Sequence, residues 1–211
     1  MVLSTALEVV SEFKSDNLKQ TLNNLRRQLI GKGKNEIVEV PHVFEAALVV
    51  KQASAQINEI VHAAGIIKCL KLILDDDEEI LDMSLASGAD GEGIDLVTNK
   101  RIAEFKFSKW QEGKKDANGM RKRQVFSDLV QLYLNDTYKN KELYVFSFDK
   151  VMKFFQSSKA DWKKTLSKSG GLGDLLFQDL YIKRLDYSSV AQIYHLSNVK
   201  VYDINEVLKS E

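Results

Sequence analysis

The spacing of apolar residues predicts helices in the first third of the chain. Leucines recur at every third or fourth position from residue 18 to residue 29, which is typical of a helix with one apolar face, and Asp16 can cap its first turn. A longer helix is expected to begin at Pro41, because proline suits the first turn of a helix. This helix either ends at Gly65 or continues through residues 66–74, since glycine weakens a helix interior without always ending it.

From Ile80 onward the apolar period shortens to two, which predicts strands. Residues 94–98 and 101–107 form two short strands on either side of Asn99 and Lys100, and residues 141–149 form a buried apolar strand. Further expected elements are a strand at 80–85, loops at 87–93, 111–119 and 168–174, helices at about 120–134 and 151–156, a strand near 199–204 and a last helical turn. This order predicts an α/β fold with a mixed central β-sheet flanked by helices. We expect a helical N-terminal extension at residues 1–40 and one compact domain at 41–211.

The predicted hairpin at residues 94–107 brings charged side chains together. If Asn99 and Lys100 form a two-residue turn, cross-strand partners have numbers that sum to 199, so Asp95 faces Glu104. Directly opposed residues of an antiparallel pair share one face of the sheet. Lys106 lies two residues beyond Glu104 and points to the same face, while Ala103, Phe105 and Phe107 point to the other, into the core.

Two opposed carboxylates repel each other, and a divalent cation is one way to offset the repulsion. Mg²⁺ prefers oxygen ligands and is often held by one or two carboxylates together with waters and substrate phosphate. Lys106 could orient or help to deprotonate a water, or stabilise charge that develops at phosphorus. Such a site hydrolyses phosphodiesters with metal assistance. The alternative is a surface salt-bridge cluster in which Lys106 only bridges the two acids.

The hairpin resembles the PD-(D/E)XK nuclease superfamily, which includes restriction endonucleases, Holliday-junction resolvases and repair exonucleases. The resemblance rests on Asp95 at the start of one strand and on Glu104-Phe105-Lys106 on the next, and it covers residues 58–149. Ile94 stands where the family pattern has proline. The resemblance implies a restriction-endonuclease-like core and metal-dependent endonuclease activity, with Asp95, Glu104 and Lys106 as catalytic residues. It also implies Mg²⁺ as the cofactor, for which Mn²⁺ can substitute.

Members of that superfamily often carry another glutamate on the helix before the first strand. Glu59 is the best candidate for this catalytic and metal-binding role, and Glu45 is the second choice. The alternative for Glu59 is an ordinary solvent-facing residue. His62 follows one turn later and is expected on the helix surface or beside a metal ligand.

The net charge is zero, but basic residues cluster after the hairpin. Phosphate backbones bind such local clusters, although a solvated basic face is the alternative. In the family, the stretch after the third strand meets DNA, which implies Lys109, Arg121, Arg123 and Gln124 as DNA-binding residues. Trp110 is expected in the core, with base stacking as the alternative. The nine basic residues of the cluster are Lys100, Arg101, Lys106, Lys109, Lys114, Lys115, Arg121, Lys122 and Arg123.

These features favour a Mg²⁺-dependent endodeoxyribonuclease, of the type II restriction kind or the catalytic subunit of one. Cutting both strands implies a homodimer or a second nuclease subunit. The alternatives are a resolvase or repair nuclease, a non-catalytic nucleic-acid-binding or assembly protein of the same fold, and a protein-interaction module. The lone Cys69 is expected in the core and excludes an internal disulfide, and three scattered histidines form no zinc motif. Without an apolar run long enough to span a membrane, a cytoplasmic location is expected.

Overall fold

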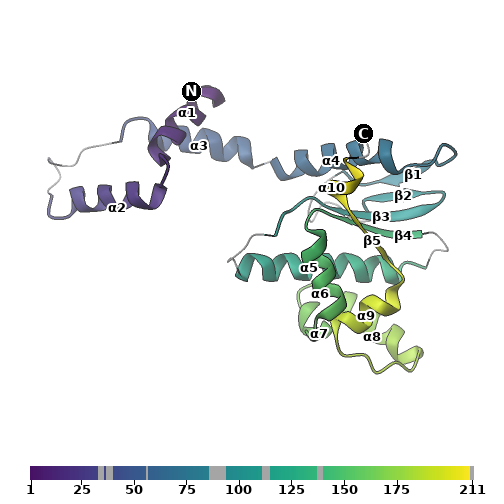
Figure 1. Ribbon diagram of the computed structural model, residues 1–211. Coiled ribbons are helices and arrows are strands. Elements are labelled where there is room, and N and C mark those ends of the chain that lie inside the picture. The colour runs from purple at the N-terminus through teal and green to yellow at the C-terminus, as the bar shows by residue number, and fades with distance from the viewer. Residues whose placement is uncertain are drawn as a thin grey trace. The chain divides into compact units, whose positions relative to one another are not determined.

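The chain divides into two compact units, Met1–Ile60 and Val61–Glu211 (Figure 1). The computed structural model describes residues 1–32, 36, 40–55, 57–85, 94–110, 115–136 and 140–209, and leaves out the side chains of residues 115–118. These compact units divide after Ile60, whereas the sequence led us to expect an extension that ends at residue 40. The reason is that α3 (Val43–Ser54) packs along α1 (Leu3–Lys14) and therefore belongs with the N-terminal helices.

The first unit has little core of its own. Ala6 of α1 and Ala46 of α3 are its fully buried apolar residues in the described part of the chain, so these helices meet through small side chains. The expected amphipathic helix is present as α2 (Leu18–Leu29), but none of its residues is buried. Its cap is Asn17 and not Asp16, because the Asn17 side chain accepts a hydrogen bond from the backbone N–H of Gln20 at 3.2 Å.

The long helix expected from Pro41 is in fact two helices. α3 ends at Ser54, and α4 (Ile57–Ile73) follows, with its residues from Val61 onward in the second unit. Gly65 does not end α4. A Cβ added at Gly65 would lie 2.5 Å from the Phe107 ring, so glycine is required there for close packing of the helix on the hairpin.

The second unit contains a five-stranded mixed sheet in the order β1-β2-β3-β4-β5. β1 (Ile80–Met83), β2 (Leu96–Thr98) and β3 (Arg101–Lys106) are antiparallel, whereas β3, β4 (Asn140–Val145) and β5 (Lys200–Asp203) are parallel. Parallel neighbours need a crossover, and α5 (Lys115–Leu134) makes the first one between β3 and β4. The predicted α/β class with a mixed sheet flanked by helices is confirmed.

Helices cover both faces of the sheet (Figure 1). On one face, Ile66 and Cys69 of α4 pack on Leu96, Ala103 and Phe105. On the other face, Ile102 and Leu143 pack against the helices that follow β3, so the expected core positions of Cys69, Ala103 and Phe105 are confirmed. These later helices are α5, α6 (Phe148–Ser157), α7 (Trp162–Thr165), α8 (Leu172–Ile182) and α9 (Val190–Ser197), while α10 (Ile204–Val207) lies with α4.

Several boundaries differ from the expected ones. The apolar strand ends at Val145 because α6 begins at Phe148, and α8 begins inside the loop expected at 168–174. α5 begins at Lys115, within the stretch expected as loop, while residues 111–114 and the loop at 87–93 lie outside the described residues. No helix in the part of the chain that the structure describes is long and apolar enough to cross a membrane.

Candidate active site at the end of the β2–β3 hairpin

The predicted register of the hairpin is confirmed. Leu96 pairs with Ala103 and Val97 with Ile102, as a two-residue turn at Asn99 and Lys100 requires. The Thr98 hydroxyl holds this turn, because it accepts hydrogen bonds from the backbone N–H groups of Lys100 at 3.0 Å and Arg101 at 2.9 Å. Asp95, one residue before β2, therefore comes opposite Glu104.

The Asp95 side chain is anchored from two elements. Its Oδ2 accepts a hydrogen bond from the backbone N–H of Phe105 at 2.8 Å, and its Oδ1 lies 3.2 Å from Nε2 of His62 on α4. Asp95 is only 6 % exposed. Burial alone would raise the pKa of its carboxyl, but the His62 hydrogen bond, the nearby Lys106 charge and the Phe105 N–H together hold that pKa below its usual range.

Glu104 and Lys106 face α5, where they meet a third carboxylate. Lys106 Nζ lies 3.4 Å from Oε2 of Glu104 and 3.2 Å from Oδ2 of Asp128. Glu104 is 3 % exposed. The Asp128 side chain is largely buried as well, and its Oδ2 has no hydrogen bond of good geometry in the described structure, so the Lys106 ammonium reaches it only as an ion pair.

The electrostatics show an excess of buried negative charge. Burial, with the charges of Asp128 and Asp95 added, raises the pKa of Glu104 well above its usual value despite Lys106. Burial also raises the pKa of Asp128. Burial disfavours the Lys106 ammonium, but the surrounding carboxylates outweigh it and raise the pKa of Lys106, so this residue stays protonated. With these carboxylates buried, the cluster is not the surface salt bridge that the sequence left open.

Asp128 was not singled out from the sequence, although a signal for it exists. One face of α5 carries residues spaced three or four positions apart, from Arg121 through Gln124 or Val125 to Asp128. Because α5 crosses the sheet over β3, this face meets the side chains of β3 that point away from α4. Only the packing of α5 on β3 brings Asp128 to Lys106.

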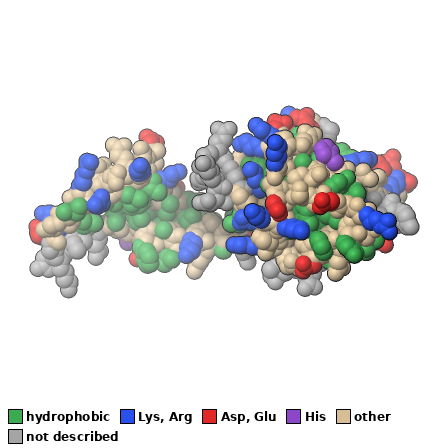
Figure 2. All heavy atoms as spheres, turned by 90° about the horizontal axis from the view of Figure 1, so that it is seen from below, with side chains coloured by type: hydrophobic (Ala, Val, Ile, Leu, Met, Phe, Trp, Pro, Cys, Tyr) green, Lys and Arg blue, Asp and Glu red, His purple; other side chains and the backbone are tan. Residues whose placement is uncertain are grey.

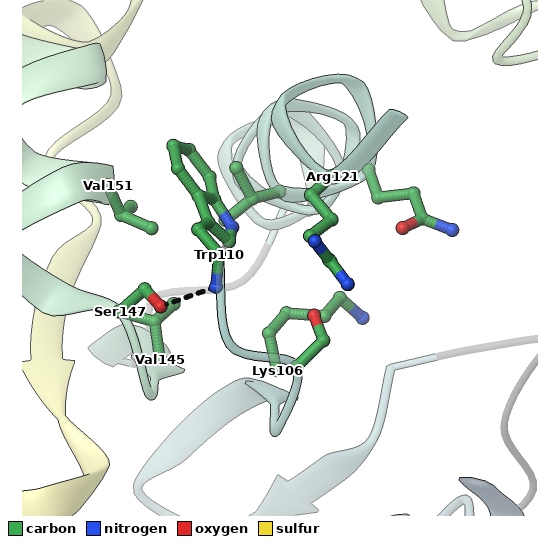
Figure 3. A pocket seen from close by; sticks show the side chains of 9 residues that line it. Lys106, Trp110, Arg121, Val145, Ser147 and Val151 are labelled. Atoms are coloured by element: carbon green, nitrogen blue, oxygen red, sulfur yellow. Dashed lines mark hydrogen bonds between the residues drawn. The ribbon is translucent and has the colours of Figure 1, made fainter. Parts of the chain in front are cut away.

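Two of the predicted DNA-binding residues lie beside Lys106. Arg121 and Gln124 line a small pocket together with Lys106, Ser108 and Trp110. Figure 3 shows the Arg121 side chain extending from α5 toward Lys106, and Trp110 anchored by the hydrogen bond from its backbone N–H to the Ser147 hydroxyl, 2.8 Å long. Trp110 is 9 % exposed and packs in the core, as expected. Two cationic side chains thus converge next to the carboxylates.

The other predicted site residues lie elsewhere. Lys109 is exposed, with Nζ 5.3 Å from the centre of the Phe146 ring, and Arg123 lines a different groove. Glu59 is exposed in the first turn of α4 and Glu45 lies in the first turn of α3, both in the first unit, so the structure does not join either of them to the hairpin. His62, in contrast, is buried and contacts Asp95 directly, so it does not lie on the helix surface.

The acidic run at residues 75–79 forms ion pairs with the beginning of β3 and the turn before it. Arg101 donates to Glu78 through Nε and Nη2, both at 2.7 Å, and to Glu142 through Nη1 at 3.0 Å. Lys100 pairs with Asp75 and Asp77. Lys100 and Arg101 belong to the basic stretch after β2, but these acids already neutralise them.

The residues fit a divalent cation held by few protein ligands. Within the described residues, no three His, Cys, Asp or Glu side chains are grouped so as to bind a metal ion. The pair of Asp95 and Glu104 nevertheless fits the usual coordination of Mg²⁺. This ion binds one or two carboxylates and completes its coordination shell with water and phosphate. The raised pKa of Glu104 marks a place where added positive charge would be stabilising.

Comparisons with known proteins assign no family to this arrangement. No family model, no curated protein and no solved structure matches the chain.

Proposed function

We propose that the second unit is a Mg²⁺-dependent endodeoxyribonuclease domain of the PD-(D/E)XK type. One observation carries the proposal: Asp95 and Glu104 are buried opposite each other at the end of a hairpin, with Lys106 beside them. Buried carboxylates that repel each other are costly for a fold, and clusters of this kind concentrate at functional sites.

Each residue has a chemical role in this proposal. Asp95 and Glu104 would hold Mg²⁺, with His62 orienting Asp95 from α4. The metal supplies a Lewis acid that polarises the phosphate and lowers the pKa of a bound water. Lys106 is held protonated by its carboxylate neighbours. This favours a role in stabilising the negative charge that builds up at phosphorus over a role as the base. Asp128 keeps the ammonium in place.

The substrate assignment rests on the pocket beside Lys106. Arg121 and Gln124 line this pocket with the Lys106 side chain, which supports binding of an anionic group next to the carboxylates. Duplex DNA presents such phosphates at regular spacing. A restriction-type enzyme cuts both strands, so we expect it to act as a homodimer or with a second nuclease subunit.

The test is cleavage of plasmid DNA and of a four-way junction by the full chain, with Mg²⁺ or with EDTA. Cleavage should require the metal, Mn²⁺ should replace it, and Asp95→Asn, Glu104→Gln and Lys106→Ala should each reduce the rate at least 100-fold. The matched controls are Glu206→Gln and Lys209→Ala, an exposed pair at the C-terminal end, and these should cut like the wild type.

Preference for the junction over plasmid would assign the same chemistry to a resolvase. Cleavage that persists in EDTA, or in Asp95→Asn, would refute the proposal.

A further inference from the structure

A second basic groove lies on the helical side of the second unit, apart from the pocket beside Lys106. Its cavity of about 390 Å³ runs between α5, α6 and α7. Figure 2 looks onto this side of the unit and shows Lys and Arg side chains gathered there. The lining includes Gly119, Lys122, Arg123, Phe154, Asp161 and Lys164.

Two cations of this groove lack partners in the described part of the chain. Arg123 is half-buried and Lys164 is exposed, and neither side chain forms an ion pair or hydrogen bond with another described residue. Lys122 is held against the groove wall, with Nζ 5.5 Å from the centre of the Phe154 ring. A partly desolvated guanidinium without a carboxylate is unfavourable unless an anion binds to it.

The single acid of the groove's lining is already engaged. Oδ1 of Asp161 accepts a hydrogen bond from the backbone N–H of Lys164 at 2.9 Å and so caps the first turn of α7. Among the lining residues that the structure describes, three cations therefore face one carboxylate, and that carboxylate already caps a helix. Gly119 adds no side chain to the lining, and a Cβ added there would meet nothing within 4 Å.

The position of the groove along α5 relates it to the candidate active site. Lys122 and Arg123 precede Asp128 by one and a half turns, about 8 Å along the helix axis at 1.5 Å per residue. Along one strand of DNA, charges recur at about 3.4 Å of axial rise, so this offset corresponds to roughly two or three nucleotides. Lys122 and Arg123 point from other faces of α5 than Asp128, so a strand that occupies both sites has to wrap around the helix.

From these charges and contacts we propose that Lys122, Arg123 and Lys164 bind the phosphate backbone of DNA that flanks the cleaved segment. The proposal rests on the proposed function for its choice of DNA as the ligand, whereas the groove itself is independent of the carboxylates. Its role is positional: interactions with phosphates fix the register of a duplex and carry no sequence information.

The test is binding of a short fluorescent DNA duplex to the full chain, measured by anisotropy over a range of salt concentrations. It is done in EDTA with Asp95→Asn as the parent, so that no cleavage intervenes. Lys122→Ala, Arg123→Ala and Lys164→Ala should each weaken binding several-fold. The triple variant should lower the slope of log K against log salt by about 0.9 for each phosphate that the protein no longer neutralises. Lys51→Ala with Lys209→Ala serves as the matched control and should bind like the parent, and circular dichroism should show that every variant is folded.

The outcomes separate this proposal from the proposed function. Groove variants that bind DNA with the affinity and salt slope of the parent would refute the DNA-binding role of the groove. They would leave the proposed nuclease activity unaffected. A chain that binds DNA through the groove but never cuts it would support the groove and refute the nuclease. Stronger competition by an acidic peptide than by unlabelled duplex would assign the groove to a protein partner and overturn it as a DNA site.

Discussion

Asp95 and Glu104 lie close together on one hairpin, yet the fold stabilises the charged form of Asp95 and the neutral form of Glu104. Asp95 receives a hydrogen bond from a backbone N–H and lies at hydrogen-bonding distance from His62, so its charged form is stabilised. Glu104 is buried, and the nearby charges of Asp128 and Asp95 add to the effect of burial and outweigh that of Lys106, so its neutral form is favoured. A carboxylate that is poorly compensated in the protein alone is a natural partner for an added cation.

This difference predicts opposite effects of two conservative substitutions on stability without metal. Asp95→Asn removes a charge that the fold stabilises and should cost about 1–3 kcal/mol in the free energy of unfolding. Glu104→Gln removes a charge that the fold disfavours, and should leave the melting temperature unchanged or raise it. Both variants should lose the stabilisation that Mg²⁺ gives the wild type. Thermal melts with and without Mg²⁺ measure this. A Glu104→Gln chain less stable than Asp95→Asn in EDTA would contradict it.

Among the elements, α4 packs closely against the end of the β2–β3 hairpin at one point, where Gly65 meets the Phe107 ring. Gly65 is a poor residue for a helix interior, but the Phe107 ring occupies the space that a side chain would need. That ring is itself fixed, with its centre 6.0 Å from that of His62 and 5.8 Å from that of Phe146. This packing therefore sets the distance at which α4 presents His62 to Asp95.

Gly65→Ala should accordingly destabilise the protein by about 1–3 kcal/mol, although alanine is the better helix former. The control is Gly119→Ala on α5, where a Cβ meets nothing within 4 Å, and this change should stabilise by up to about 1 kcal/mol. Chemical denaturation measures both. Phe107→Leu should partly rescue Gly65→Ala, and equal effects of the two glycine substitutions would disprove the packing argument.

The hairpin is also anchored at its turn, by ion pairs with the segment before β1. Burial opposes ionisation of Glu78, but hydrogen bonds from Arg101, Thr98 and the backbone N–H of Asp75 outweigh it and lower the pKa of Glu78 to about 2. Because the folded pKa lies below the unfolded value, the stabilisation is present above pH of about 4.3 and is lost as the pH falls toward 2.

Glu78→Gln should therefore destabilise the chain at neutral pH by on the order of 2–3 kcal/mol and flatten the loss of stability between pH of about 4.3 and 2. Urea denaturation across this range, compared with the exposed control Glu206→Gln, tests the claim. A Glu78→Gln chain whose stability falls with acid as steeply as that of the wild type would exclude this ion pair as the cause.

At the scale of the whole molecule, the two units differ in how much they bury. In the first unit Ala6 and Ala46 are the buried apolar residues among those described, and α2 exposes Leu18 and Leu22. In the second unit, both faces of β3 and β4 are covered by helices and their apolar residues are buried. Local stability follows burial, so the two units should open with different free energies.

Amide hydrogen exchange read by mass spectrometry should show this difference. Amides of β3, β4 and the second half of α5 should exchange slowest, and those of α2 fastest, with protection differing by several orders of magnitude. Equal protection of α2 and β3 at low protein concentration would contradict the expectation. Protection of α2 that appears only at high concentration would indicate that a second copy covers its leucines.

The local parts of the candidate site could be predicted from the sequence, because they depend on the spacing of apolar residues and on the geometry of a short turn. The two-residue turn at Asn99 and Lys100 sets the register, which pairs Leu96 with Ala103 and so brings Asp95 near Glu104 and Lys106. The α/β class with a mixed sheet followed from the order of the predicted helices and strands. A helix between β3 and β4 permits these two strands to pair in parallel.

Only the tertiary structure decided what surrounds that hairpin. The positions of His62 against Asp95 and of Asp128 against Lys106 depend on how α4 and α5 pack on opposite faces of the sheet, which no local pattern encodes. The persistence of α4 through Gly65 likewise goes with the close contact between this residue and the Phe107 ring. The physical reason is the same in each case. Register depends on residues close in sequence, whereas burial and the resulting pKa values depend on residues that meet only in the folded chain.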